Sequence, residues 1–164
     1  MPQVAVFMGS KSDKAQMLPC IEVLEQLEIS YRFTITSAHR TPERTESLVR
    51  TLEEDGCHVF ICGAGMAAHL AGAVAAKTTR PVLGVPLHAS PLNGMDALLS
   101  TVQMPPGFPV GTLALDKAGA KNAAWFAAQI LALSDPALSE KIIRARRLMQ
   151  DEVVRAAEEL SPEQ

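Results

Sequence analysis

The sequence predicts an α/β fold, a three-layer sandwich in which a parallel sheet lies between two layers of helices. Short apolar runs alternate with longer segments of helical periodicity, as in repeated strand-helix units. The runs are apolar along their whole length, which is typical of parallel strands covered on both faces. The chain has 164 residues, 48% of them hydrophobic, enough for one substantial core. We therefore expect a single domain over residues 1–164.

The first half of the chain alternates strands with helices. Apolar, β-branched and aromatic residues predict strands over Val4–Met8, Tyr31–Thr36 and His58–Cys62. Apolar residues three or four positions apart predict helices over Asp13–Leu27 and Pro42–Asp55.

The second half continues this alternation. After Cys62 we expect a loop at Gly63-Ala64-Gly65 and then an alanine-rich helix over Met66–Lys77. Further strands are predicted over Pro81–Val85 and Val110–Leu115, and further helices over Met95–Val102 and Gly119–Leu133. Right-handed crossovers and a flavodoxin-like strand order would bring the loops after the strands to one edge of the sheet, where ligands bind in such folds.

A long C-terminal helix is predicted over residues 135–160. Its apolar stripe keeps a step of three or four residues: Leu138, Ile142, Ala145, Met149, Val153 and Ala156. At about 1.5 Å per residue the helix is longer than a small domain is wide. We therefore expect part of the stripe to pack on a neighbouring subunit of a homo-oligomer. The alternative is a helix that wraps over its own domain and frays at its end.

Composition limits the possible partners and compartments. The formal net charge of -3 argues against a nucleic-acid or anionic-membrane surface, because such partners usually demand a basic face. No apolar run approaches the roughly 18 residues of a membrane helix. The three cysteines include no CxxC pair, and the first residues predict a strand instead of a secretory signal. A cytoplasmic location fits best.

A metal site is not expected. Cys57, His58 and Cys62 have the right side chains for metal ligands, but alternate residues of a strand point to opposite faces. No complementary pair of ligands lies nearby in the sequence.

The first loop with chemical potential is Gly9-Ser10-Lys11-Ser12-Asp13, between a predicted strand and a predicted helix. Ser10 and Ser12 offer hydroxyl and N–H groups, and Asp13 can accept hydrogen bonds from sugar hydroxyls. This set suits a ribose phosphate. Simple capping of the helix by Ser12 or Asp13 is the alternative.

The second loop, Ser37 to Pro42, places a proton-transfer group beside a fixed cation. Thr41 followed by Pro42 is typical of an N-cap and the first helical position. His39 and Arg40 therefore precede a helix N-terminus, where Arg40 and the free N–H groups could hold a phosphate while His39 reaches the reacting atoms. Alternatively, His39 is a satisfied histidine and Arg40 a solvated surface charge.

The third loop, Gly63 to His69, has a partial likeness to the dinucleotide-binding fingerprint. That fingerprint needs an acidic residue about 20 positions later, whereas the first acid here is Asp96. We therefore expect the loop to form a wall against a flat substrate ring. His69 could contact the ligand or be buried against the sheet.

Four strings carry a resemblance to a known family: Gly9 to Asp13, Ser37 to Pro42, Gly63 to Leu70, and Gln103-Met104-Pro105. In residue type, order and spacing they resemble the class I N5-carboxyaminoimidazole ribonucleotide mutases of purine biosynthesis. The resemblance implies a flavodoxin-like fold, an octamer, and no metal or organic cofactor. It implies nucleotide binding by Ser10, Asp13 and Arg40 and proton transfer by His39. We extend the expected substrate contacts to Ser12, Ser37, Gly65, Ala67 and His69.

The sequence departs from the family pattern at Ala71, where proline is usual. The sister class, which carboxylates aminoimidazole ribonucleotide directly with CO2, resembles this chain less, because it generally has an arginine and a serine in place of the alanine-rich His69 loop. Direct carboxylation stays as an alternative. A non-enzymatic ligand-sensing module is less favoured, because the first loop has only Asp13 where a receiver needs an acidic cluster. A nucleotide-binding dehydrogenase is weakened by the missing ribose acid.

The implied reaction matches the residues. Moving a carboxylate from the exocyclic nitrogen to C4 of the ring requires that one proton be given and another removed. Histidine can do both near neutral pH, and we assign this task to His39. The wall formed by the Gly63–His69 loop would exclude water and retain CO2.

Overall fold

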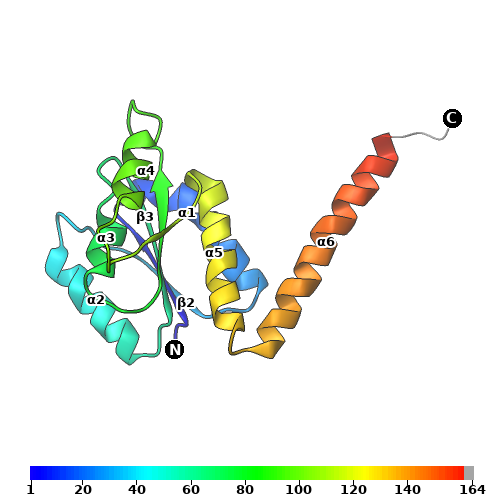
Figure 1. Ribbon diagram of the computed structural model, residues 1–164, viewed down its shortest axis with the longest axis horizontal. Helices are drawn as coiled ribbons and strands as arrows, with labels where there is room; N and C mark the ends of the chain where they lie inside the picture. The colour runs from blue at the N-terminus through cyan, green and yellow to red at the C-terminus, as the bar shows by residue number, and fades with distance from the viewer. Residues whose placement is uncertain (161–164) are drawn as a thin grey trace.

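A computed structural model describes residues 1–160 of the chain. Within these residues, five parallel strands form one sheet in the order β2-β1-β3-β4-β5. Figure 1 shows the sheet lying between its helices. The strands are β1 (Val4–Met8), β2 (Tyr31–Ile35), β3 (Val59–Gly65), β4 (Val82–Leu87) and β5 (Gly111–Thr112). The helices are η1 (Lys11–Asp13), α1 (Lys14–Gln26), α2 (Pro42–Glu54), α3 (Leu70–Ala75), α4 (Met95–Val102), α5 (Asp116–Ala132) and α6 (Pro136–Leu160). The predicted α/β sandwich with a flavodoxin-like parallel sheet is confirmed.

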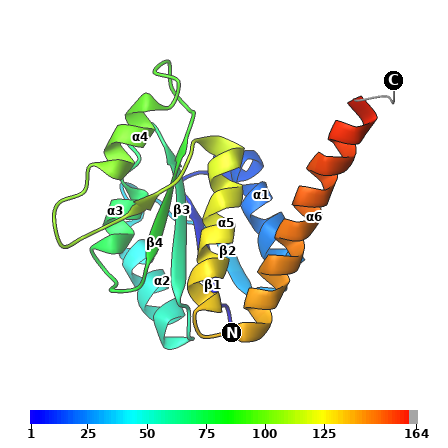
Figure 2. The same cartoon turned by 45° about the vertical axis from the view of Figure 1, so that its right-hand side comes forward.

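Helices cover both faces of the sheet. The side chains of each strand point alternately to the two faces, so each face contributes to its own core layer under the helices. In β1, Val4 and Val6 join a cluster with α1 and α5, whereas Ala5 and Phe7 join one with α2 and α3. Figure 2 shows these helix pairs on opposite faces. All five residues of β1 are buried, which explains why its sequence is apolar throughout.

The third strand is longer than the sequence predicts. Gly63, Ala64 and Gly65 belong to β3 and pair with β4, so they are not the expected loop. Packing favours glycine here, because a Cβ on Gly63 would collide with the buried side chain of Met17. The helix that follows is correspondingly shorter. It begins at Leu70 and not at Met66, whose φ of 57° is left-handed and cannot start a helix.

Two further predictions need correction at the outer strands. β4 runs on to Leu87 and includes Pro86, although the predicted strand ends at Val85. The fifth strand has only two residues, and it pairs with Leu83 and Gly84 alone. Pro86 therefore lies beyond the part of β4 that β5 covers, a position that a residue without an N–H tolerates. Ala71 is in the first turn of α3, a helix position that also accepts proline.

Helix α6 confirms the predicted long helix, but only its first half packs on the sheet domain. Leu138, Ile142 and Ala145 are buried, whereas Met149 is 43% and Val153 70% exposed. The second half reaches away from the sheet (Figure 1). The helix therefore does not wrap over its own domain.

No helix within residues 1–160 combines the length and apolar character needed to cross a membrane. The single domain over residues 1–164 stays a prediction, and residues 161–164 lie outside the described part of the chain.

Candidate active site

A cavity of about 490 Å³ lies where β1, β3 and β4 reach their carboxyl ends. We call it the carboxyl-end cavity. All the residues expected at a substrate site line it: Ser10, Ser12, Asp13, Ser37, His39, Arg40, Gly65, Ala67 and His69. The parallel topology explains this convergence, because loops that follow neighbouring strands meet at one edge of the sheet.

The first loop is held in shape by hydrogen bonds among its own side chains. The Ser10 N–H donates to Asp13 Oδ2 at 2.9 Å, and the Ser12 N–H donates to Ser10 Oγ at 3.4 Å. Ser10 caps η1, which is a different residue from the Ser12 or Asp13 of the capping alternative. Asp13 occupies the N-cap of α1, but its side chain makes no capping bond to that helix. Ser10, Ser12 and Asp13 also line the cavity. The hydrogen bonds among them therefore fix the position of polar groups at the cavity wall.

Asp13 is an acid in an unusual environment, because only 8% of its surface is exposed. Burial raises the pKa of its carboxyl group. Hydrogen bonds from Ser12 and Ser10 and the charge of Arg40 act in the opposite direction. A buried carboxylate at the cavity wall is well suited to accept hydrogen bonds from a ligand's hydroxyl groups.

The second loop forms a tight turn between β2 and α2. Pro42 is the first residue of α2, as predicted. Thr41 occupies the N-cap, but its side chain does not cap the helix. Its hydroxyl instead accepts from the Ser37 N–H at 3.0 Å and lies 3.2 Å from the Ser37 carbonyl. A buried contact between the hydroxyls of Thr36 and Thr45, at 2.7 Å, joins the end of β2 to the first turn of α2.

Arg40 joins the second loop to the first. Its Nη2 donates to the Gly9 carbonyl at 2.9 Å, and its Nε lies 3.4 Å from Ser37 Oγ. These bonds hold the guanidinium at the cavity wall, although the residue is exposed. The alternative of a freely solvated surface charge does not apply.

His39 lies against His69 of the third loop. His39 Nε2 is 2.8 Å from His69 Nδ1, and the rings meet edge to face with centroids 5.0 Å apart. His69 is exposed, so the alternative of burial against the sheet is wrong. A hydrogen bond between two imidazoles requires one nitrogen to carry a proton and the other to accept it. The tautomers of the two rings are therefore linked.

Small and apolar residues form the rest of the wall. Gly65 approaches the loop after β4 so closely that a Cβ on it would lie 2.6 Å from the Cβ of Ala89. Ala89 also lines the cavity and was missed as a site residue. Its place in a loop after β4, at the same sheet edge as the other three loops, was the available signal.

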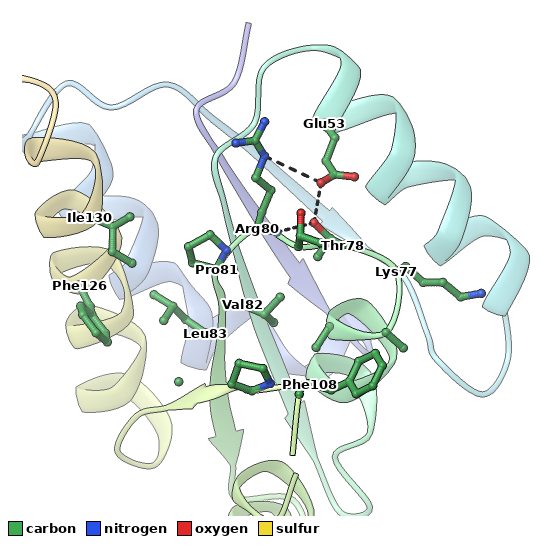
Figure 3. A pocket seen from close by; sticks show the side chains of 16 residues that line it. Glu53, Lys77, Thr78, Arg80, Pro81, Val82, Leu83, Phe108, Phe126 and Ile130 are labelled. Atoms are coloured by element: carbon green, nitrogen blue, oxygen red, sulfur yellow. Dashed lines mark hydrogen bonds and ion pairs between the residues drawn. The ribbon is translucent and has the colours of Figure 1, made fainter. Parts of the chain in front are cut away.

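A second and larger cavity, of about 1000 Å³, lies at the opposite edge of the sheet, where β4 begins. We call it the amino-end cavity. Phe108, Phe126 and Ile130 line it together with Arg80 and Lys77 (Figure 3). None of the expected site residues contributes to it.

The cysteines offer no reactive group. All three are buried free thiols. Burial raises the pKa of Cys20 to about 12 and that of Cys57 to about 11, and it raises the pKa of Cys62 as well, which disfavours the nucleophilic thiolate. Among the described residues, no group of three or more His, Cys, Asp or Glu side chains is arranged to hold a metal ion.

Comparison with known proteins gives consistent matches. The family model described as AIR carboxylase matches residues 3–152. The N5-carboxyaminoimidazole ribonucleotide mutase of Escherichia coli K12 is 51% identical over 152 residues, which cover 93% of this chain and 90% of the relative. The mutase of Bacillus subtilis is 46% identical, covering 97% of this chain and 98% of the relative.

A solved structure agrees with these matches. The crystal structure of Treponema denticola PurE superimposes with a TM-score of 0.89 at 26% identity, covering 99% of this chain and all of that one. The likeness in sequence and fold extends over nearly the whole chain, including every loop of the carboxyl-end cavity. The chain therefore belongs to the AIR carboxylase family.

Proposed function

We propose that the protein is an N5-carboxyaminoimidazole ribonucleotide mutase, an isomerase of de novo purine biosynthesis. It converts its substrate to 4-carboxy-5-aminoimidazole ribonucleotide. The observation that carries this proposal is the convergence of three polar loops on one cavity, with the paired imidazoles of His39 and His69 at its wall. The identity of about half of all residues to mutases of this name supports it.

The cavity divides into a polar side and an apolar side, and we place the substrate accordingly. The phosphate and ribose lie along the first loop, where Ser10, Ser12 and Asp13 present hydroxyl, amide and carboxylate groups. The guanidinium of Arg40 neutralises the phosphate by charge-assisted hydrogen bonds. The heterocycle then lies against Gly65 and the small residues near it.

His39 carries the proton steps. The bond between the exocyclic nitrogen and its carboxylate breaks, CO2 leaves, and the nitrogen takes a proton from the imidazole. Carbon C4 then attacks the carbon of CO2, and the proton on C4 returns to the imidazole. The protons balance over one turnover, so a single imidazole can serve as acid and then base. The contact with His69 orients the ring of His39 for both transfers.

CO2 must remain in the cavity between these steps. It is small and apolar overall, so alanine and glycine surfaces suit it better than charged groups do. Ala64, Ala67, Ala89 and Gly65 line the cavity together with the polar loops and provide such a surface. We propose that this wall keeps CO2 close to C4 and limits its exchange with water.

The decisive assay offers the purified protein two substrates in separate reactions. One reaction contains N5-carboxyaminoimidazole ribonucleotide, and the other contains aminoimidazole ribonucleotide with bicarbonate. The proposal predicts that the first substrate yields the C4-carboxylated product much faster. A faster second reaction would indicate the direct carboxylase. Nucleotide binding without turnover of either substrate would indicate a ligand-sensing module.

We also propose that the protein works as a homo-oligomer in the cytoplasm, and the octamer implied by the family resemblance is the specific assembly we expect. The exposed half of the α6 stripe supports association, because Met149 and Val153 are 43% and 70% exposed on a folded helix. Sedimentation velocity would give the mass of the assembly. Val153→Asp should shift it toward smaller species, with Glu158→Asp, on the same half of the helix, as control.

A further inference from the structure

Ser100 of α4 is outside the motifs that the sequence singles out and outside the carboxyl-end cavity, yet it contacts the loop that carries His69. Residues 66–69, here called the wall loop, lie between β3 and α3. The Ala68 N–H donates to Ser100 Oγ at 2.9 Å. This bond crosses from one loop to a helix 32 positions further along the chain.

The Ser100 hydroxyl is fixed at both ends. Its oxygen accepts from Ala68, and its proton points to the Asp96 carbonyl one turn earlier in α4, at 2.7 Å. The Met66 carbonyl lies 3.4 Å away. The one hydroxyl proton goes to the nearest carbonyl, that of Asp96, so the side chain ties the third residue of the wall loop, Ala68, to α4.

The wall loop needs such an external support. Met66 adopts a left-handed backbone conformation with φ of 57°, which is unfavourable for a residue with a side chain. The loop is too short to form helical hydrogen bonds of its own before α3 begins at Leu70. Within the loop the His69 N–H donates to the Ala67 carbonyl at 2.9 Å. The bond from the Ala68 N–H to Ser100 satisfies a further backbone donor and holds the loop against α4.

We infer that Ser100 is a positioning residue for the two-histidine pair. His69 directly follows Ala68, and its Nδ1 lies 2.8 Å from His39 Nε2. Because the Ala68 amide is held by Ser100, the adjoining backbone of His69 is held as well. His69 in turn orients the His39 ring. Asp13 and Arg40 are the other charged groups of the cavity, and neither contacts Ser100. The kinetic part of this inference rests on the proposed mutase function.

The neighbouring residue Thr101 provides a matched control. Its hydroxyl also donates to a carbonyl one turn earlier in α4, that of Ala97 at 2.7 Å. Thr101 faces a different neighbour, since its methyl group packs over Gly84 of β4. Thr101→Ala thus removes a hydroxyl-to-carbonyl hydrogen bond within α4 and a buried methyl group. It keeps the hydrogen bond between Ala68 and Ser100 that holds the wall loop.

The experiment compares Ser100→Ala, Thr101→Ala and Ser100→Thr with the unaltered enzyme. Ser100→Ala should lower kcat by about tenfold while KM changes by less than about twofold, because the ring that transfers protons is misplaced and the nucleotide contacts remain. Ser100→Thr keeps the hydroxyl and should retain most of kcat. Thr101→Ala should lower the melting temperature at least as much as Ser100→Ala, yet keep kcat.

A second measurement needs no turnover. Nitrogen-15 spectra of labelled histidine report which ring nitrogens carry a proton. In the unaltered protein the signals of His39 Nε2 and His69 Nδ1 should show a shared hydrogen bond, and Ser100→Ala should weaken this signature while Thr101→Ala preserves it. Unchanged histidine spectra in Ser100→Ala would overturn the inference, as would equal kcat losses in both alanine variants. Absence of turnover in the unaltered protein would contradict the proposed function instead, and the spectra would still decide the role of Ser100.

Discussion

The two cavities at opposite edges of the sheet differ in size and in the state of their charged groups. The amino-end cavity is about twice as large, 1000 Å³ against 490 Å³. Its charged side chains are paired: Arg80 lies 3.9 Å from Glu53 within the cavity (Figure 3). Lys77 pairs at 2.8 Å with Glu46, which does not line the cavity. In the carboxyl-end cavity, hydrogen bonds to backbone and hydroxyl groups hold Asp13 and Arg40 in place.

This difference shows why volume alone does not identify a site in this fold. Chemistry requires polar groups that are fixed in position and still able to bind a ligand, and the parallel topology gathers them at one edge only. The predictions below test that contrast, beginning with the variant for which we expect the largest loss of turnover.

His39→Asn should have the largest effect. Asparagine keeps a polar side chain of similar size but cannot exchange a proton near neutral pH, so turnover should fall by about 10² to 10⁴. Nucleotide affinity should change little. Product formation and a calorimetric titration with the product nucleotide measure the two quantities. Full turnover in this variant would remove His39 from the mechanism.

Arg40→Ala should weaken nucleotide binding by roughly 1.5 to 3 kcal/mol, the range for a hydrogen bond to a charged group. The matched control is Arg44→Ala. Arg44 is in the first turn of α2, directly after the second loop. Its guanidinium lies near the Ile35 carbonyl and the Thr34 hydroxyl and does not line the cavity. Equal affinity losses in the two variants would mean that Arg40 contributes only to the overall positive charge near the nucleotide and makes no specific contact with its phosphate.

Asp13→Asn should separate binding from stability. Because burial raises the pKa of Asp13, the folded protein binds a proton there more readily than the unfolded chain does. The resulting stability is present below the ordinary value of 3.8 and is lost as the pH rises through the raised value. Asparagine does not titrate, so the variant should gain stability relative to the unaltered protein as the pH rises through this window.

Thermal unfolding at a series of pH values checks this sign. Nucleotide affinity of Asp13→Asn should fall at neutral pH by about tenfold, through loss of a charge-assisted hydrogen bond. A variant that is both less stable at neutral pH and unaltered in affinity would make Asp13 a cap of η1 and nothing more.

Phe108→Ser should have the smallest effect on catalysis. Phe108 lines the amino-end cavity and is 48% exposed, so its replacement removes apolar surface without touching the three polar loops. We expect kcat and KM within about twofold of the unaltered values, since surface substitutions away from a site are usually mild. A large rise in KM would show that the amino-end cavity takes part in substrate binding.

The elements of this fold could largely be predicted from sequence, because apolar runs and helical spacing report directly on burial. Errors arose where tertiary contacts override local pattern. Gly63 and Gly65 are typical of a loop, yet their missing side chains let β3 continue past Met17 and Ala89. The left-handed conformation of Met66, which delays α3, has no local signal in the sequence.

The candidate site was predictable as a set of loops but not as a set of contacts. Strand order brings the loops together, so the three motifs could be assigned to one edge. The contact between His39 and His69 spans 30 positions and depends on how the wall loop is held by Ser100. Such a contact follows from packing between elements and cannot be read from spacing along the chain.

The most direct test is a crystal structure of the protein with its product nucleotide bound. We predict the heterocycle within about 3.2 Å of a His39 ring nitrogen and the phosphate beside Ser10 and Arg40 in the carboxyl-end cavity. A nucleotide bound only in the amino-end cavity, or a His39 ring turned away from the heterocycle, would contradict the account.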